Sequence, residues 1–383
     1  MNLPNVNLSF NADRIARIAR EVQEIARTKR DFVSDRKSMS VQVVDGSLAL
    51  RMEGLPQPDG TRGPDLFSLT RDSTADLCGT LDVPAKFLER LVGRGHGDVA
   101  ASTLTTLLAR EPKRHLVRTL GGRARAILSD SYRTLDNYDL MVIALREVQA
   151  VGAQVWDLRH QEDGRSFSLI AVHPAVAEQV RDDVPGAHAI RRLDGRPDLV
   201  YPGIKVSNSE TGGGKWSVAP FVFRAICKNG MTLTQAIGQV HLGRKRETLG
   251  EIVYSDETKR LEDEVILRKT REVIQGTFDR ERFQRTVETL NATTQQPIEK
   301  PTEAVDAAIK VLGIPEEHRE AILEGLLGSR DKTQFGLAQA VTALANPDNR
   351  GSKPDDLLDL LEAAGGRILQ ASPREFAQLV GAR

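Results

Sequence analysis

Two strand–turn–strand patterns limit the folds that this chain can adopt. Each consists of two short, largely apolar runs around a two-residue turn, Asp45-Gly46 in the first and Gly121-Gly122 in the second. Strands joined by such short turns pair antiparallel. The sequence therefore predicts a sheet built from hairpins. The paired runs are residues 39–44 with 47–52, and residues 113–120 with 123–129.

An amphipathic pattern predicts a helix near the N-terminus. Between residues 9 and 30, Ile15, Ile18, Val22 and Ile25 recur at three- and four-residue steps. The neighbouring sequence gives this apolar stripe no strong reason to fold back on its own subunit. We therefore expect residues 1–37 to form a helical arm, either solvated or in contact with a partner subunit or a phosphate backbone.

The rest of the chain divides into a core that contains the sheet and a helical C-terminal region. Residues 38–292 form the core, which ends in one long amphipathic helix over residues 256–292. The polar, proline-bounded stretch 293–301 is the best linker candidate, and residues 302–383 have helical patterns. We therefore expect an α+β fold, with an antiparallel sheet of hairpins packed on helices and a helical C-terminal region.

The charge balance excludes a protein that is basic overall. The 383 residues contain 53 Lys and Arg and 53 Asp and Glu, so the formal net charge is zero. A local basic face is compatible with this balance. No signal peptide and no membrane-spanning run is visible in the sequence. With only Cys78 and Cys227, we expect a cytoplasmic protein without a disulfide framework or a thiolate zinc site.

The sequence contains no recognisable catalytic or cofactor motif, and we expect no cofactor. Gly214-Lys215 lacks the glycine spacing and the following Ser or Thr of a phosphate-binding loop. One enzymatic alternative stays open, because a cluster of Asp130, Asp136 and Glu210 could hold Mg²⁺ for phosphodiester hydrolysis. Helix capping by Asp136 and turn formation at Asp130 are the simpler explanation for these two aspartates.

Basic residues are concentrated in the predicted hairpins. Residues 110–133 hold seven Lys or Arg against two acids, and residues 203–246 hold seven against Glu210 alone. A basic strand face can follow a phosphate backbone, and nearby aromatic rings can stack on unpaired bases. The candidate phosphate contacts are Arg114, Arg118, Arg123, Arg125, Arg133, Lys205, Lys215 and Arg224, and the candidate stacking rings are Tyr132 and Trp216.

Four segments carry a family resemblance. They read AILSDSYRTLDN at 126–137, VSNSETG at 206–212, FRAICKNGM at 223–231, and TQFGL followed by AVTALA within 333–345. In this order they resemble a phage- and plasmid-borne family, domain-of-unknown-function family 932. The resemblance implies a protein carried by a mobile element, and it assigns no catalytic residue.

A fold-level analogy suggests a function. The predicted order of hairpin, helix and further antiparallel strands is similar to the β-β-β-α core of ring-forming single-strand annealing proteins, which pair complementary strands without ATP. The sequence therefore predicts a homo-oligomeric protein that binds or anneals single-stranded DNA in recombination or replication. The alternatives are a metal-dependent nuclease and an anti-defence or scaffold protein that binds a host protein.

Overall fold

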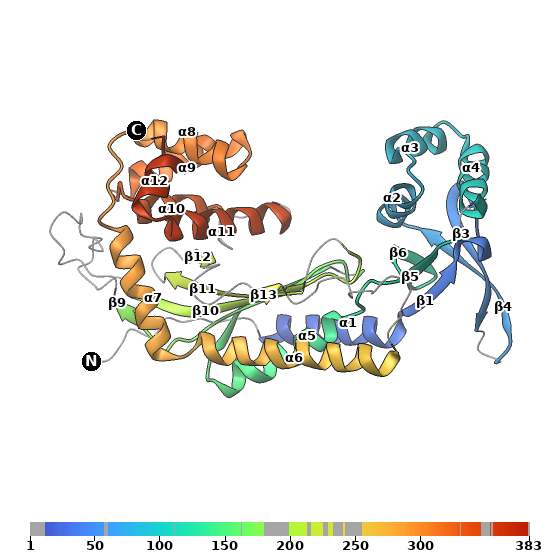
Figure 1. Cartoon of the computed structure of the whole chain (residues 1–383), viewed down its shortest axis with the longest axis horizontal. Coiled ribbons are helices and arrows are strands. Elements are labelled where there is room, and N and C mark those ends of the chain that lie inside the picture. The colour runs from blue at the N-terminus through green and yellow to red at the C-terminus, as the bar shows by residue number, and fades with distance from the viewer. Residues whose placement is uncertain are drawn as a thin grey trace.

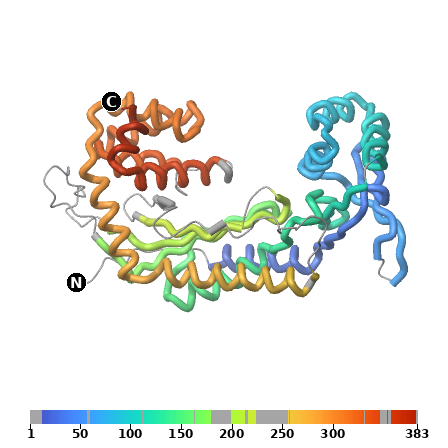
Figure 2. The backbone as a smooth tube through the Cα atoms, in the orientation of Figure 1, coloured from blue at the N-terminus to red at the C-terminus, as the bar shows by residue number. Residues whose placement is uncertain are grey.

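The computed structural model is an α+β fold with two sheets. Figure 1 shows a smaller body, here called the first lobe (residues 30–129), beside a larger body, the second lobe, formed by the other described residues. Figure 2 follows the chain from a helix of the second lobe into the first lobe and back again. The structure describes residues 12–56, 60–110, 112–161, 163–179, 199–212, 216–224, 229–232, 240–241, 255–329, 331–345, 353 and 355–381.

The first lobe is a six-stranded sheet with helices packed on one face. All strand pairs in it are antiparallel except β4 with β6, which is parallel. Leu50 and Phe67 of the sheet are buried with Leu77, Leu88 and Leu104 of the helices. The strands, in spatial order, are β1 (Arg30–Asp35), β5 (Arg114–Leu120), β6 (Arg123–Ser129), β4 (Arg62–Leu69), β3 (Ser47–Pro56) and β2 (Met39–Val44), and the helices are η1 (Arg36–Ser38), α2 (Arg71–Thr80), α3 (Ala85–Gly93) and α4 (Gly97–Arg110).

Both hairpins that opened the sequence analysis are confirmed. Asp45 and Gly46 connect β2 to β3 with φ of +49° and +77°, and Gly121 and Gly122 connect β5 to β6 with φ of +56° and +75°. Two successive residues with positive φ form the turn whose twist matches that of paired strands. These turns set the register of the two hairpins.

The second lobe contains the other sheet, which lies between two groups of helices (Figure 1). Helices α1, α5 and α6 share a buried core with one face, while α10 and α11 contact β12 from the side of the C-terminal helices. The strands are β12 (Asn229–Thr232), β11 (Ser217–Arg224), β10 (Leu199–Asn208), β8 (Phe167–Val172) and β7 (Gln154–His160) in spatial order, with β9 (Glu178–Gln179) on β10 and β13 (Val240–His241) on β11; the helices of the first group are α1 (Ala12–Thr28), α5 (Asn137–Ala150) and α6 (Asp256–Thr277).

Helix α1 packs on its own chain, so the expectation of a free helical arm is wrong for its described residues. Ile18, Val22 and Ile25 are buried, and the first two belong to the core formed with α5 and β7. Arg14 also donates a hydrogen bond to the carbonyl oxygen of Leu158 in β7, at 3.0 Å. Partners distant in sequence therefore cover the apolar stripe. Residues 1–11 lie outside the described residues.

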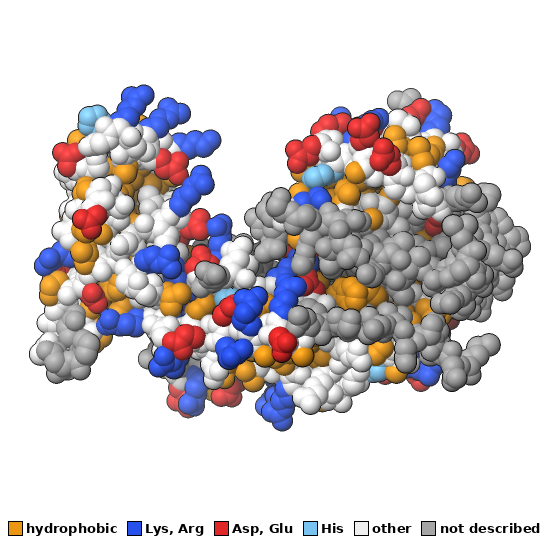
Figure 3. Space-filling model, turned by 180° about the vertical axis from the view of Figure 1, so that it is seen from behind, with side chains coloured by type: hydrophobic (Ala, Val, Ile, Leu, Met, Phe, Trp, Pro, Cys, Tyr) orange, Lys and Arg blue, Asp and Glu red, His pale blue; other side chains and the backbone are white. Residues whose placement is uncertain are grey.

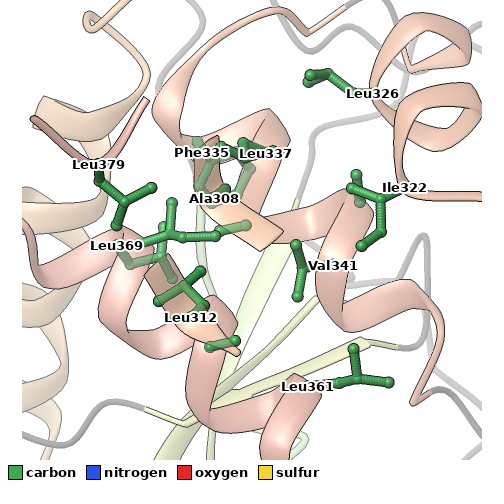
Figure 4. Packing of buried hydrophobic residues seen from close by; sticks show 14 of the residues in the cluster. Ala308, Leu312, Ile322, Leu326, Phe335, Leu337, Val341, Leu361, Leu369 and Leu379 are labelled. Atoms are coloured by element: carbon green, nitrogen blue, oxygen red, sulfur yellow. The ribbon is translucent and has the colours of Figure 1, made fainter. Parts of the chain in front are cut away.

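The C-terminal region is helical, as expected, but the long helix predicted before it is divided. The single helix predicted over residues 256–292 is two helices, because Asp279 accepts a hydrogen bond from the Arg282 amide and caps a new helix. Figure 4 shows how buried side chains from the later helices pack toward one another. These helices are α7 (Arg280–Thr293), α8 (Pro301–Leu312), η2 (Glu316–His318), α9 (Arg319–Gly328), α10 (Gln334–Ala343), α11 (Asp355–Gln370) and α12 (Pro373–Leu379).

The stretch expected to be a linker, residues 293–301, is held in place. The Ile298 amide donates to the carbonyl oxygen of Lys332 at 2.7 Å, and the Gln334 amide donates to that of Gln296 at 2.9 Å. Ile298 is buried in the core of the C-terminal helices. These contacts contradict an exposed, flexible connection. No helix in the described ranges has both the length and the apolarity needed to cross a bilayer.

Candidate functional site

A buried network of charged side chains joins the two lobes. Arg118 of β5 is fully buried and points out of the first lobe toward the second. Its guanidinium donates to both carboxylate oxygens of Asp31, to Oδ1 of Asp136 at 2.8 Å, and to the carbonyl oxygen of Glu210 at 2.9 Å. One side chain from the first lobe thus binds the residue before the N-terminus of α5 and the backbone just after β10.

A bulge in β6 directs a second arginine into this network. Arg118 pairs with Ala126 and Thr119 with Ala124, so Arg125 has no partner on β5. Such bulges change the direction of a side chain and often lie beside functional sites. Nη2 of Arg125 donates to Oε2 of Glu210 at 2.7 Å, and Nη1 donates to the carbonyl oxygen of Asp163 at 2.8 Å.

The second lobe completes the hydrogen bonds of Glu210. Oε1 of Glu210 accepts from the backbone amide of Asn137 at 2.8 Å, in the first turn of α5, where amides lack partners within the helix and favour negative charge. The Asn137 side chain donates to the carbonyl oxygen of Gly164, and Nδ2 of Asn208 donates to Oδ1 of Asn137. Two of the segments quoted for the family resemblance, 126–137 and 206–212, therefore meet here.

The charges of this network balance. Three cations, Lys29, Arg118 and Arg125, contact three carboxylates, those of Asp31, Asp136 and Glu210. Burial by itself would raise the pKa of Asp31, but Arg118 and then Lys29 hold that pKa below its usual value. Because breaking one member of a buried ion pair leaves the other without a partner, the network strongly favours this one arrangement of the lobes.

Several of the predicted phosphate contacts are therefore wrong. Arg118 and Arg125 are occupied by carboxylates inside the junction. Arg133 is largely buried and paired with Glu262 and Asp263 of α6, each at 3.1 Å. Lys205 is buried and lies 2.5 Å from carboxylate oxygens of both Asp359 and Glu362 in α11. These cations are not available to an external phosphate.

The two predicted stacking rings are also engaged inside the protein. Trp216 is buried in the core beneath α6, where its Nε1 donates to Oγ1 of Thr270 at 2.9 Å. The hydroxyl of Tyr132, a half-buried residue, donates to the carbonyl oxygen of Ser209 at 2.9 Å. Trp216 is thus wrong as a stacking candidate, and Tyr132 positions the loop that carries Glu210.

The carboxylate set of the nuclease alternative is not assembled. Both carboxylate oxygens of Glu210 accept hydrogen bonds within the junction, Asp136 pairs with Lys29 and Arg118, and Asp130 is exposed. Among the described residues, no three His, Cys, Asp or Glu side chains lie together in a way that could hold a metal ion.

Among the predicted contacts, Arg114 and Arg123 are exposed at the two ends of the β5–β6 hairpin. Lys215 lies outside the described residues, as does the side chain of Arg224. The basic surface expected along the sheet is thus reduced to two described positions, both in the first lobe.

Helix α3 carries cations that the sequence analysis did not select. Lys86, Arg90 and Arg94 are exposed, and in the described part of the chain none of them has an ion-pair partner. The four-residue spacing places Lys86 and Arg90 along one side of the helix, and Arg94 is the residue that caps its C-terminal end. Figure 3 shows a hollow between the lobes, with Lys and Arg side chains on the wall that the first lobe forms. The four-residue spacing of these cations is the sequence feature from which this basic surface could have been predicted.

Comparisons of the chain with models of protein families, with curated proteins and with solved structures find no match. The resemblance to the phage- and plasmid-borne family stays a prediction. The contacts and charges of the chain itself are therefore the basis of the functional proposal.

Proposed function

We propose that this protein binds single-stranded DNA along the basic side of its first lobe. The observation that carries the proposal is the row of exposed cations without ion-pair partners among the described residues, Lys86, Arg90 and Arg94. Figure 3 shows Lys and Arg side chains on the first lobe's side of the hollow. Cations without internal partners can replace the counterions of a phosphate backbone. Arg114 and Arg123 add further exposed positive charge to the same lobe.

The distribution of charge between the lobes favours this surface. In the second lobe, Arg133 and Lys205 are neutralised by internal carboxylates, as Arg118 and Arg125 are at the junction. A chain with no net charge attracts a polyanion only where its positive charge is left uncompensated. The first lobe supplies such a region, and the rigid junction keeps it at one side of the hollow.

Fluorescence anisotropy with a labelled single strand tests the proposal. We expect binding of intact DNA that weakens as salt rises, with and without Mg²⁺, since the cations rather than a metal make the contacts. Absence of binding at low salt would contradict the proposal and favour a scaffold protein that binds a host protein. Cleavage that requires Mg²⁺ would favour the nuclease.

Annealing requires that two strands are held together, and we propose that a homo-oligomer does this. Among the described strands, β1 and β2 are the outer strands of the first sheet. Thr105 of α4 already binds both backbone groups of Val41 in β2, so we expect β1 to be the strand that pairs with another chain. Size-exclusion chromatography with light scattering should give a mass well above that of a dimer. A monomer of 42.1 kDa, with and without DNA, would restrict the function to strand binding.

A further inference from the structure

An exposed aromatic ring lies at the edge of the basic surface. Phe87 of α3 is 55% exposed, which makes it the most exposed large hydrophobic residue among those described and the one aromatic ring in that group. The core of the first lobe does not include it. The packing of α3 comes from other positions, namely Ala85, Leu88, Leu91 and Val92. Phe87 therefore has no structural role visible in its own lobe.

The exposed cations of this segment lie to one side of the ring. At about 100° per residue, Lys86, Arg90 and Phe87 fall at roughly 0°, 40° and 100° around the helix, and Arg94 follows as its C-cap residue. The acidic residue of the helix, Glu89, lies on the other flank and pairs with Arg71 at 3.3 Å. The exposed ring thus borders a strip of positive charge that forms no ion pair with a carboxylate of the described residues.

A ring among uncompensated cations matches the chemistry of an unpaired nucleic-acid strand. Bases of a single strand expose their faces and stack on aromatic side chains, while the phosphates on either side contact Lys and Arg. In a duplex these faces are covered by neighbouring base pairs. An apolar protein partner would suit the ring but would leave the three cations desolvated without counter-charges.

We propose that Phe87 is a stacking site for an unpaired base, with Lys86, Arg90 and Arg94 holding the adjacent phosphates. This inference rests on the proposed binding of single strands and adds the way in which the protein distinguishes a single strand from a duplex. It assigns to α3 the contact with the bases, which the sequence had placed on Tyr132 and Trp216.

Binding to two oligonucleotides of equal length tests the role of the ring. One is oligo-thymidine, and the other has the same phosphates with abasic sites in place of the bases. In the full-length protein, Phe87→Ala should weaken binding to oligo-thymidine by about fivefold or more, the lower range for loss of one stacked base. Binding of the abasic strand should not change, because the phosphate contacts are intact.

Two further variants separate stacking from simple burial of an apolar side chain. Phe87→Trp should retain the affinity for oligo-thymidine, and its additional indole fluorescence should be quenched by the stacked base. Phe87→Leu keeps an apolar side chain without a flat ring and should behave like Phe87→Ala.

The outcomes distinguish this inference from the proposed function. If the wild-type protein binds both strands and Phe87→Ala binds them equally well, the stacking site is wrong while strand binding stands. If Phe87→Leu binds like the wild type, the ring contributes apolar area and does not stack. If the wild type binds neither strand, both proposals are overturned.

Discussion

Nη2 of Arg125 lies 2.7 Å from Oε2 of Glu210, and the two side chains are only 2% and 1% exposed. Arg125 belongs to the first lobe and Glu210 to the second, so this ion pair spans the junction. Arg118 reinforces it from the neighbouring strand through the backbone of Glu210. The relative position of the lobes therefore depends on a few buried charges as well as on apolar packing.

Removing the carboxylate of Glu210 should destabilise the protein strongly. Glu210→Ala leaves Arg125 buried without its partner, and breaking a buried pair in this way costs about 3–5 kcal/mol in the free energy of unfolding. Urea denaturation measures the change. Glu53→Ala is the matched control, because Glu53 forms an exposed pair with Arg51, and its loss should cost less than about 1 kcal/mol. Equal effects of the two variants would argue against a structural junction.

The half-buried carboxyl of Asp76 should make the stability of the protein depend on pH. Burial is the main cause that raises the pKa of Asp76 to about 6, with the charge of Asp72 adding to it and the hydrogen bond from the Ile127 amide opposing it. The folded state thus binds this proton more tightly than the unfolded state. The stabilisation is complete below the usual pKa of about 4 and is lost as the pH rises through 6.

Replacing Asp76 with Asn removes this dependence. Because Asn does not ionise, Asp76→Asn should raise the melting temperature relative to the wild type more at pH 8 than at pH 5. Thermal unfolding followed by circular dichroism at both pH values measures the difference. A gap between variant and wild type that is the same at pH 5 and pH 8 would show that the carboxyl ionises in the folded protein as it does in the unfolded one.

Lys205 should control how the C-terminal helices dock on the sheet. Lys205→Met removes the cation that contacts the carboxylates of both Asp359 and Glu362, and it leaves Glu362 with the longer contact to Arg159, at 3.7 Å. We expect faster hydrogen exchange in α11 and α12, since local opening becomes easier when the contacts of a segment are lost. Lys310→Met, at an exposed position of α8, is the control and should leave the exchange rates unchanged. Equal protection in both variants would contradict the role of Lys205.

The cations of α3 should account for much of the salt dependence of DNA binding. Replacing Lys86, Arg90 and Arg94 with Ala should lower the slope of log affinity against log salt by roughly 2, at about 0.7 for each phosphate contact of a single strand. Ala substitutions at the exposed residues Lys310, Lys332 and Arg374 of the second lobe remove the same net charge and are the control. If both sets of substitutions lower the slope equally, the protein attracts DNA through its overall charge and not through the cations near α3.

The sequence was informative where structure depends on neighbouring residues. Asp45-Gly46 and Gly121-Gly122 determine their turns locally, and both hairpins are present as predicted. The cap that separates α6 from α7 is local too, since Asp279 bonds to an amide three residues later. The alternating charges on both sides of Asp279 favoured one continuous helix, so the cap was not recognised in the sequence.

The predicted site failed where the partner lies far along the chain. Arg118 finds Asp31 at a separation of 87 residues, and Arg125 finds Glu210 at 85 residues. The sequence of a basic strand does not show whether its arginines and lysines will contact phosphates or carboxylates of the same protein. The apparent linker near Ile298 is fixed in a similar way, by the backbone of Lys332.

The path of the chain through the junction bears on how the protein folds during synthesis. The chain leaves α1 for the first lobe and returns to the second lobe at α5. Lys29, just before the first lobe, forms an ion pair with Asp136, just after it. The first lobe is thus inserted as a continuous module within the second. On the ribosome it can fold as soon as residue 129 has emerged, while α1 still waits for α5 and β7. The residues that flank this module, Lys29 and Asp136, lie together, so replacing the segment between them with a short loop is geometrically feasible.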